Sequence, residues 1–454
     1  MRKIVSIIIV SLAVLGAKPV KCQSISLEKA KEMTLVNNHI IKQSQLDATK
    51  AGEVRKEAFT KYFPSVSATG FAMKSSDYFL KGSIPEMNLP VYDGNPANLA
   101  GATQFAYFPG AELNLVDYLN NGAVTAMQPV FAGGQIRYGN KLARVATDIA
   151  AEQNNMTVRD ELFVTEKYYW TLANLVAQRK SVAAYKLLLQ SLRKDVSVSL
   201  ANGLVQKSDL LKVDLKLNEV EMNDLMLENG IHAVRQALSQ QIGIEYSNQL
   251  IPSDSVEMLL PPAALYASPD SALRNRPEFN MLSKAVDVSI LQKQMEAGKI
   301  LPTIAVGAAG IYIDAMDNST TNGMLIASVS VPLSDWWGGS YRIKQKSIEV
   351  EKSKCQLADN SEKLLIQQKT AYNTLNEMWH RVALSAVAYT EAVEHLKVVT
   401  DNHRAGMVSM TDLLDAQAMW QHANQQKSEA MFNYIIEMAY YKSLNSTAEY
   451  QNKP

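Results

Sequence analysis

Two long helical patterns dominate this sequence. Apolar or small residues recur at every seventh position from Leu142 to Val198 and again from Ile343 to Val399, and neither stretch contains a Pro or a Gly. A seven-residue repeat keeps one side of a helix against a neighbouring helix and requires supercoiling. At 1.5 Å per residue, helices over about 140–200 and 342–403 would each be roughly 90 Å long. The chain therefore cannot fold into one compact globular domain.

Each long helical pattern ends in the same nine-residue turn. The first copy is GLVQKSDLL, beginning at Gly203, and the second is GMVSMTDLL, beginning at Gly406. Glycine can take the left-handed conformation that closes a helix, and Ser208 in the first copy, or Thr411 or Ser409 in the second, can cap the helix that follows. Because apolar spacing of three and four residues resumes after each turn, we predict two long antiparallel helical hairpins. The chain is thus an internal duplication.

Two strand-like segments precede each hairpin. In the second half they lie within about 302–333, where the stretch from Met324 to Leu333 alternates and has one apolar face. In the first half they lie within about 64–131 and enclose an insertion, about 74–122, rich in Gly, Asn, Pro and aromatic residues. Strands of about ten residues can cross an outer membrane as part of a tilted barrel. Four strands cannot close a barrel, so several chains must contribute.

The passage from strand to helix has a similar sequence in the two halves. PVFAGGQ begins at Pro129, and PLSDWWGGS begins at Pro332. We expect each Pro at a strand end and paired glycines at the change of direction. Trp336 and Trp337 suit the aromatic belt of a membrane interface, and a packed position under a hairpin is the alternative. The paired glycines are Gly133, Gly134, Gly338 and Gly339.

Composition argues against several classes of protein. Among 454 residues, 45 Lys and Arg balance 45 Asp and Glu, so there is no net charge with which to attract nucleic acid. The six histidines lack metal-ligand spacing, and neither a phosphate-binding glycine loop nor a catalytic serine or cysteine pattern is present. We therefore expect no enzyme and no cofactor or metal site. The energy for any transport must come from another protein.

The first 22 residues have the layout of a secretory signal peptide. Arg2 and Lys3 precede an apolar run, and small or neutral residues lie near Cys22. The sequence leaves open whether Cys22 is removed with the peptide or kept as a lipid-anchored residue. No later run approaches the roughly 18 to 20 apolar residues of a membrane-spanning helix. If the exported chain crosses a membrane, it must do so as strands of a closed barrel.

The combined pattern resembles the TolC-type outer-membrane efflux proteins, the exit ducts of tripartite pumps in Gram-negative bacteria. The resemblance covers nearly the whole mature chain. It rests on the duplicated plan, the Pro and Gly-Gly junctions, the repeated turn, and DLLDAQ followed by AMFNYI. It implies a mixed α/β membrane protein, a homotrimer in which each chain gives four strands to a twelve-stranded transmembrane β-barrel. The barrel would be continuous with a periplasmic tunnel of long coiled-coil helices.

The resemblance also implies a division of the chain. An equatorial belt would combine the linker with the C-terminal tail. The expected segments are a signal peptide (1–22), a first repeat (23–244) with an N-terminal helix, a strand pair and a hairpin of about 135–244, an equatorial linker (245–273), a second repeat (274–442) with a hairpin of about 340–442, and a tail (443–454).

Only the second turn carries another acid three residues on. Asp412 and Asp415 lie on one face of the following helix, whereas Lys212 has the position equivalent to Asp415 in the first copy. Acids at a helix N-terminus also complement the macrodipole, which is sufficient to explain Asp209 and Asp412. In the family, the matching acid pair faces the channel axis at the periplasmic tip. The resemblance therefore implies a periplasmic gate at Asp412 and Asp415, with Asp209 as a further gate residue.

The implied function is a passive outer-membrane duct. Its implied partners are a periplasmic adaptor at the hairpin tips, an inner-membrane pump of the RND, ABC or MFS type, and outer-membrane lipid. A periplasmic coiled-coil adaptor or scaffold without a pore is the alternative. Basic residues that help to close the entrance in the best-known members are replaced here by Val408 and Met431. The sequence does not identify the substrate, or decide whether the insertion is a surface lid or a plug.

Overall fold

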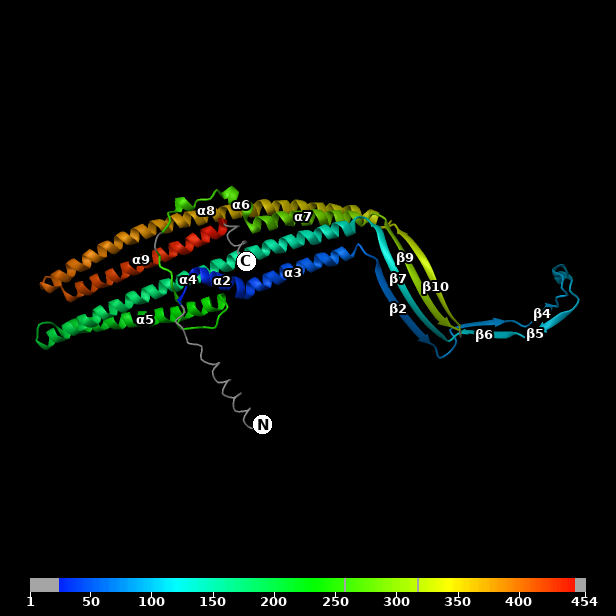
Figure 1. Cartoon of the computed structure of the whole chain (residues 1–454), viewed down its shortest axis with the longest axis horizontal. Coiled ribbons are helices and arrows are strands. Elements are labelled where there is room, and N and C mark those ends of the chain that lie inside the picture. The colour runs from blue at the N-terminus through cyan, green and yellow to red at the C-terminus, as the bar shows by residue number, and fades with distance from the viewer. Residues whose placement is uncertain (1–23, 257–258, 317, 446–454) are drawn as a thin grey trace, which may run out of the picture. The chain divides into compact units, whose positions relative to one another are not determined.

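The computed structural model describes residues 24–256, 259–316 and 318–445. The predicted signal peptide, Cys22 and most of the predicted tail lie outside the described residues. The helices are α2 (Leu27–Asn37), α3 (His39–Thr60), α4 (Gln135–Ala201), α5 (Lys207–Gln241), α6 (Pro269–Asn275), α7 (Pro277–Gly298), α8 (Asp335–Arg404) and α9 (Met410–Asn445), with 3-10 turns η1 (Pro96–Gly101) and η2 (Pro262–Leu265) (Figure 1). The strands are β1 (Ser24–Ile25), β2 (Ser65–Lys74), β3 (Leu80–Ile84), β4 (Met87–Pro90), β5 (Phe105–Phe108), β6 (Ala111–Val116), β7 (Tyr118–Ala132), β8 (Ile251–Pro252), β9 (Thr303–Ala315) and β10 (Asn318–Ser330).

The chain forms two compact units, and each unit draws on both halves of the sequence. Among the described residues, the helical unit contains residues 24–51, 146–256, 259–286 and 352–445. The strand unit contains residues 52–145 and 287–351. Helices α3, α4, α7 and α8 contribute residues to both units. No helix in the described ranges is long and apolar enough to span a membrane.

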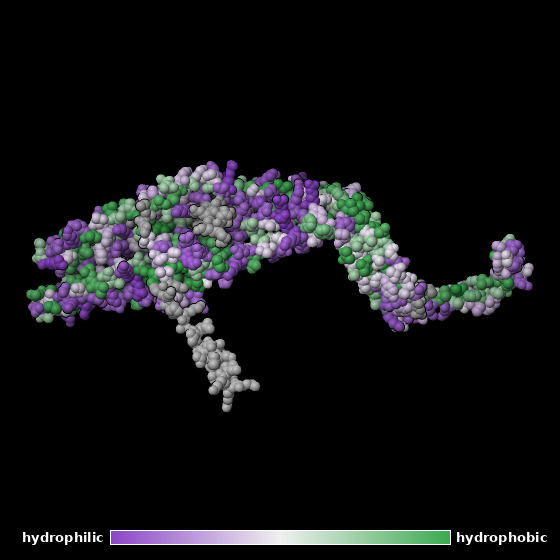
Figure 2. Space-filling model, in the orientation of Figure 1, coloured by the Kyte–Doolittle hydropathy of each residue, from purple (hydrophilic) through white to green (hydrophobic). Residues whose placement is uncertain are grey.

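The strand unit is built on a four-stranded antiparallel sheet with the order β10-β9-β7-β2. The hairpin of the first half meets that of the second where β7 pairs with β9, which leaves β2 and β10 as the edges. The apolar face predicted for the last strand is uncovered within the chain, since Leu325 is 90% exposed and Val329 is 68% exposed. Figure 2 shows hydrophobic surface along these strands. The sheet therefore leaves both edges and an apolar face unsatisfied.

Two strands are longer than predicted. The stretch Asn318–Gly323 resembles a loop, but it pairs residue by residue with β9, and the turn is confined to the positions around Met316. In the first half, the insertion was expected to extend to about residue 122, but β7 already begins at Tyr118. The Asn120 side chain donates a hydrogen bond to Asp314 at 3.1 Å. Polar residues with low strand propensity are thus held in the sheet by their partners.

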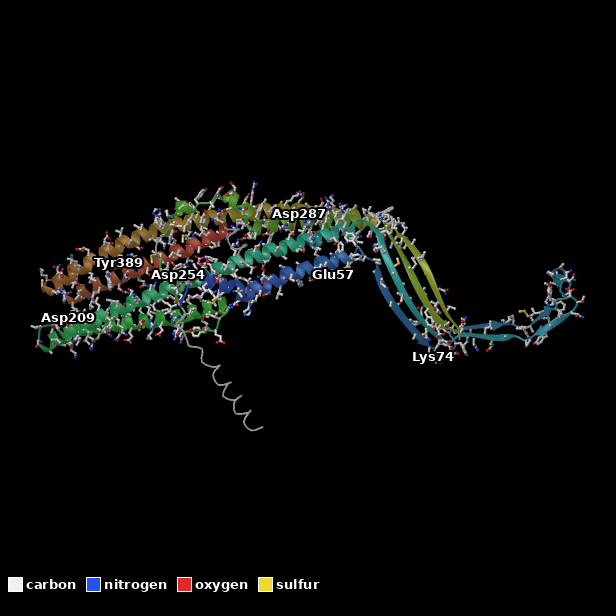
Figure 3. The ribbon with its side chains drawn as sticks, in the orientation of Figure 1. Glu57, Lys74, Asp209, Asp254, Asp287 and Tyr389 are labelled. Atoms are coloured by element: carbon white, nitrogen blue, oxygen red, sulfur yellow. The ribbon has the colours of Figure 1, made fainter. Side chains whose placement is uncertain are left out.

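The insertion of the first half forms a narrow ribbon of strands. β3 pairs with β6 and β4 pairs with β5, both in antiparallel fashion, and η1 lies between β4 and β5. The ribbon begins where the pairing of β2 with β7 ends, at Lys74 opposite Tyr118. Figure 3 labels Lys74 at this end of the sheet. The insertion is therefore an ordered extension of the β2–β7 hairpin.

The helical unit contains two antiparallel hairpins, α4 with α5 and α8 with α9 (Figure 1). α4 has 67 residues and α8 has 70, and they contain the two predicted helical ranges, about 140–200 and 342–403. Both helices begin before the heptad pattern does. The N-terminal turns of α8 include Gly338 and Gly339, which the sequence suggested would lie outside the helix.

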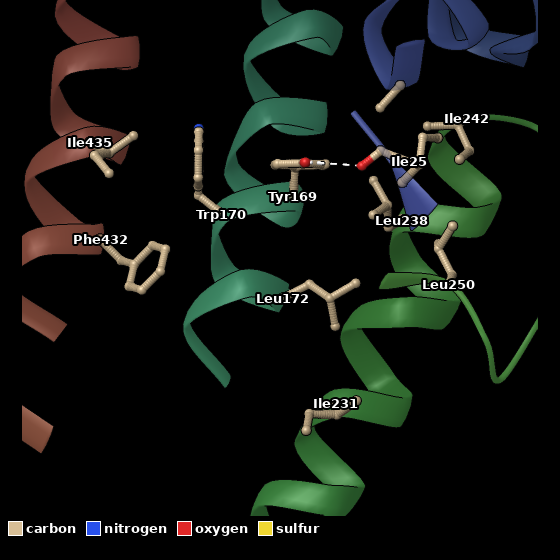
Figure 4. Close-up of a cluster of buried hydrophobic side chains, with 11 residues drawn as sticks. Ile25, Tyr169, Trp170, Leu172, Ile231, Leu238, Ile242, Leu250, Phe432 and Ile435 are labelled. Atoms are coloured by element: carbon tan, nitrogen blue, oxygen red, sulfur yellow. Dashed lines mark hydrogen bonds between the residues drawn. The ribbon is translucent and has the colours of Figure 1, made fainter. Parts of the chain in front are cut away.

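A buried apolar cluster joins both hairpins to the N-terminal segment (Figure 4). Tyr169 is fully buried, and its hydroxyl donates to the carbonyl of Ile25 at 3.0 Å. The same hydroxyl accepts the N–H groups of Ser253 and Asp254, both at 3.1 Å. It thereby fixes the short parallel pairing of β1 with β8 against α4. The labelled cluster residues are Ile25, Tyr169, Trp170, Leu172, Ile231, Leu238, Ile242, Leu250, Phe432 and Ile435.

A buried ionic network fixes the start of α7 to α4. Arg159 donates two hydrogen bonds to the carboxylate of Glu278, at 2.8 and 3.0 Å, and Arg276 donates another at 2.9 Å. Burial alone would raise the pKa of Glu278, but the two guanidinium groups outweigh it and lower that pKa to about 2. Arg276 is only 2% exposed, and this carboxylate is the acidic partner that the structure gives to its buried guanidinium.

We expect Glu278→Gln to weaken the helical unit and to alter its acid sensitivity. At pH 7 it leaves two buried guanidinium groups without their shared carboxylate, a loss of about 3–5 kcal/mol for a buried pair. The folded pKa of Glu278 lies below its ordinary value of 4.5. Its contribution is therefore complete above about pH 4.5 and is lost as the pH falls toward 2. Urea unfolding in detergent, followed by circular dichroism, should show a shallower decline from pH 5 to 3 in the variant.

Asp160→Asn is the matched control, because Asp160 also bonds to Arg159 but its side chain is 54% exposed. It should change stability by less than about 1 kcal/mol. An identical pH profile for wild type and Glu278→Gln would contradict the assignment.

Candidate functional site at the hairpin tips and strand-to-helix junctions

The two hairpin turns have the same backbone geometry. Gly203 and Gly406 have φ angles of 74° and 73°, in the left-handed region. In the first turn the N–H of Leu204 donates to the carbonyl of Ser199 at 2.9 Å, and Gly203 N–H donates to Leu200. The second turn repeats both bonds, from Met407 to Asn402 and from Gly406 to His403. Each long helix therefore ends in a Schellman motif.

The helices that follow the turns begin differently. Ser409 caps α9: its hydroxyl accepts the N–H of Asp412 at 3.2 Å, and the Asp412 carboxylate accepts the Ser409 N–H at 2.9 Å. The Ser409 hydroxyl also donates to that carboxylate at 2.7 Å, and these hydrogen bonds lower the pKa of Asp412. Asp412 thus closes a reciprocal capping box.

The prediction that Ser208 caps the first returning helix was wrong. α5 begins at Lys207, so its N-cap is Gln206, which makes no side-chain capping bond. Ser208 is already within the helix and donates to the side chain of Gln206 at 3.2 Å. Thr411 occupies the equivalent place in α9 and is not its cap.

Sequence reasoning missed a contact between the two tips. The Lys212 ammonium donates to the Thr411 hydroxyl at 2.9 Å and lies 3.4 Å from Asp209. Beneath it, an apolar cluster combines residues of α4 and α5 with Met410, Leu413 and Leu414 of α9. The only signal in the sequence was that a lysine replaces the second acid of the repeat.

The predicted gate acids have different surroundings. Asp209 lies in the first turn of α5 beside Lys212, and Figure 3 labels it at the tip. Asp412 is exposed but engaged in its cap, whereas Asp415 is exposed and has no side-chain hydrogen bond or ion pair with any described residue. Asp412 and Asp415 thus present the free acidic surface of the second tip.

Val408 and Met431, the two positions that depart from the family pattern, make no contact that joins one hairpin tip to the other among the described residues. The carbonyl of Val408 contacts the His403 ring nitrogen at 3.2 Å within the second turn. Met431 packs against the apolar cluster around Tyr169. Lys212 is the described basic residue that links the two tips.

The first strand-to-helix junction changes direction at its glycines. Gly133 and Gly134 have φ angles of 59° and 77° and lie between β7 and α4. A Cβ on Gly133 would be only 2.0 Å from the carbonyl oxygen of Gly298. Pro129 lies three residues inside β7, next to an irregularity in the pairing with β9, and not at the strand end as expected. A proline is tolerated there because the ladder is already interrupted.

The second junction does not use its glycines to change direction, contrary to our expectation. The chain turns at Leu333 and Ser334, just after Pro332, and α8 has already begun at Asp335. Gly339 lies inside α8, and a glycine suits this position because a Cβ there would be 2.4 Å from a side-chain carbon of Ile300. Gly338 is in the same helical turn.

The two tryptophans beside this junction are exposed. Trp336 donates its indole N–H to the carbonyl of Ile300 at 3.0 Å and is 54% exposed. Trp337 is 75% exposed. Their rings are therefore available to surroundings outside the chain.

The fold is that of outer-membrane channels of known structure. With OprN the TM-score is 0.72 at 13% identity, covering 92% of this chain and 89% of that one. With Campylobacter jejuni CmeC it is 0.73 at 10% identity, covering 96% and 92%. With Neisseria gonorrhoeae MtrE, solved in its open state, it is 0.72 at 11% identity, covering 97% and 95%. No curated protein matches the sequence.

Residues 268–439 match the family model described as outer membrane efflux protein. The second half of the chain is thus similar to the outer membrane efflux proteins. The predicted fold class is confirmed at the level of the chain, which has the fold of outer-membrane channels, with four strands in one sheet and two long helical hairpins. The same matches support the predicted location in the outer membrane. Transport, and not catalysis, is the activity of this family.

We expect Gly133→Ala to destabilise the efflux protein far more than Gly203→Ala. Both substitutions put a Cβ on a left-handed residue, at a cost of about 1–2 kcal/mol. A Cβ at Gly203 meets nothing within 4 Å, whereas one at Gly133 collides with the backbone at Gly298. Thermal unfolding of the detergent-purified proteins measures the difference. Equal losses would show that the junction backbone relaxes freely.

Proposed function

We propose that this protein is the passive outer-membrane duct of a tripartite efflux or secretion system and that it works as a homotrimer. The observation that carries the proposal is the four-stranded sheet with two unpaired edges and an uncovered apolar face. In water such a sheet would expose its edges to aggregation. In a bilayer, the apolar face suits lipid and the edges must be paired.

Three copies supply the missing pairs. All three neighbouring pairs in the sheet are antiparallel, so β10 runs opposite to β2. Pairing β10 of one copy with β2 of the next continues the antiparallel order and gives twelve strands. An even number of antiparallel strands is the usual arrangement of bacterial outer-membrane barrels. Trp336 and Trp337 would then lie in the interfacial aromatic belt.

The duct needs partners because the chain has no nucleotide-binding motif of its own. We propose an inner-membrane pump of the RND, ABC or MFS type as the source of energy. A periplasmic adaptor would dock at the tips of the helical hairpins. The poreless adaptor alternative is disfavoured by the fold, which matches outer-membrane channels over more than 90% of the chain.

Asp412 and Asp415 are proposed as the entrance ring. Around a threefold axis the pair becomes six carboxylates, and charges about 6 Å apart repel by roughly 1–3 kcal/mol at effective dielectrics between water and a protein surface. The lowered pKa of Asp412 keeps that carboxylate charged at neutral pH. An acidic ring favours cations over anions.

Lys212 is proposed as the residue that holds the tips together. It joins α5 to the start of α9, the helix that carries both ring acids. The Lys212 side chain is 44% exposed, so its contact with Thr411 stabilises the closed tips by no more than about 1 kcal/mol. A weak contact of this kind suits an entrance that must open when a partner binds.

We expect Asp412→Ala with Asp415→Ala to raise the conductance in planar bilayers by about twofold or more and to lower the preference for cations, because the ring loses its charge. The control is Asp359→Ala with Glu362→Ala, which also removes two acids, but from α8 and not from α9, the helix that carries Asp412 and Asp415. Reversal potentials in a salt gradient report selectivity. An unchanged reversal potential in the ring variant would remove the gate assignment.

We expect Lys212→Ala to make openings up to about fivefold more frequent, the factor that corresponds to about 1 kcal/mol. Thr411→Val should have the same effect, and the double variant should add little to either. Lys216→Ala is the control, since Lys216 pairs with Glu219 in its own helix. Single-channel recording measures the opening frequency. Additive effects of the two tip substitutions would contradict a direct contact.

A further inference from the structure

In the ribbon of residues 75–117, the strand pair next to the sheet, β3 with β6, has two chemically different faces. In β3 and β6, the pairs Gly82 with Leu113 and Ile84 with Ala111 lie on one face. Lys81 with Asn114 and Ser83 with Glu112 lie on the other, because neighbouring residues of a strand point to opposite sides. One face is therefore apolar and the other polar.

β4 and β5 do not repeat this division. Met87 pairs with Phe108 and Leu89 pairs with Ala106 on one face. The other face carries Asn88 with Tyr107 and Pro90 with Phe105, and the Tyr107 hydroxyl donates to Glu86 at 2.7 Å. The division into an apolar and a polar face is therefore a property of β3 and β6, the part of the ribbon next to the sheet.

No described part of the chain buries this apolar face. None of residues 75–116 whose side chains are described is buried, and Leu113 and Leu89 are 39% and 44% exposed. Figure 2 shows hydrophobic surface along the ribbon. A two-stranded ribbon by itself is marginally stable in water. Its ordered apolar face thus calls for a partner surface.

We propose that the apolar faces of the three ribbons of a trimer pack against one another around the threefold axis and form a cap over the outer end of the duct. This rests on the proposed trimer. β3 follows directly from β2, the edge strand that another copy completes, so the ribbon continues from the subunit interface. Symmetry places three such ribbons around one axis, with the face carrying Lys81 and Glu112 turned outward.

Charge favours this occupant over a lipid surface. Between residues 75 and 117 there are five acids and one lysine, which gives a net charge of −4. Segments that bind anionic lipid headgroups are rich in Lys and Arg. Lys81 pairs with Asp77, and Glu112 lies on the polar face, so these charges need not enter the packed face.

Cysteine cross-linking in the full-length protein tests the cap. Leu113→Cys is introduced together with Cys355→Ser, which removes the free exposed cysteine of the described chain. A short bismaleimide, applied to outer membranes, should give covalent dimers. Glu112→Cys is the matched control, one residue away on the opposite face, and should give few dimers.

The results separate the cap from the trimer. A trimeric mass in detergent, with strong cross-linking at Leu113 and little at Glu112, supports the cap. A trimer that shows no cross-linking at Leu113, or equal cross-linking at both positions, overturns the cap and leaves the duct standing. Strong labelling of Leu113→Cys by a maleimide carried on lipid in the same membranes also overturns it. A monomeric mass contradicts the proposed function and the cap with it.

Discussion

Unpaired backbone groups at the two edges of one sheet are the constraint on which the rest of this structure depends. β2 and β10 each have one side without a partner, and no other strand among the described residues pairs with either edge. Outside a bilayer, water can satisfy those groups, but the exposed Leu325 and Val329 make water a poor solvent for the sheet. Inside a bilayer the edges must be closed. The trimer proposed above meets both requirements with copies of the same chain.

The helical unit meets a different requirement, because its helices are too long to be held by one core. Separate clusters are therefore spaced along the hairpins: one around Tyr169, one at the tips and one around Tyr434 and Tyr441. Between the first two clusters lies a polar stretch with two hydrogen bonds between α4 and α9. Gln178 of α4 donates to Glu429 of α9, and Asn424 of α9 donates to Ser181 of α4. Buried polar contacts of this kind fix the register of packed helices more than their stability. The position of the tips is thus set by two apolar clusters, one around Tyr169 and one at the tips themselves, with the polar hydrogen bonds between them.

The sequence was sufficient for the parts of the fold that depend on repetition. Seven-residue spacing predicted α4 and α8, and the repeated glycines marked the turns. It was insufficient where tertiary pairing overrides local preference. Asn318–Gly323 has the composition of a loop, but the ladder with β9 keeps it extended. Likewise, a similar Gly-Gly pair changes the chain direction at Gly133, where φ is left-handed, but lies within α8 at Gly339, where the close approach of Ile300 leaves no room for a Cβ. At the tip, the sequence indicated the acids, but a contact between residues 199 positions apart, Lys212 and Thr411, has no local signature.

The differences between the duplicated tips follow from the same geometry. Both turns place a residue of the returning helix three positions after the shared acid, and both therefore present it on the same helix face. In the first copy that residue is Lys212, which reaches across to the second tip. In the second copy it is Asp415, which reaches no described residue. A lysine in both copies would leave Asp412 as the only one of these two acids at the second tip, and an acid in both would remove the link between tips. The two turns share their backbone geometry, and the residue three positions after the shared acid gives each tip its own character, attachment in the first and exposed charge in the second.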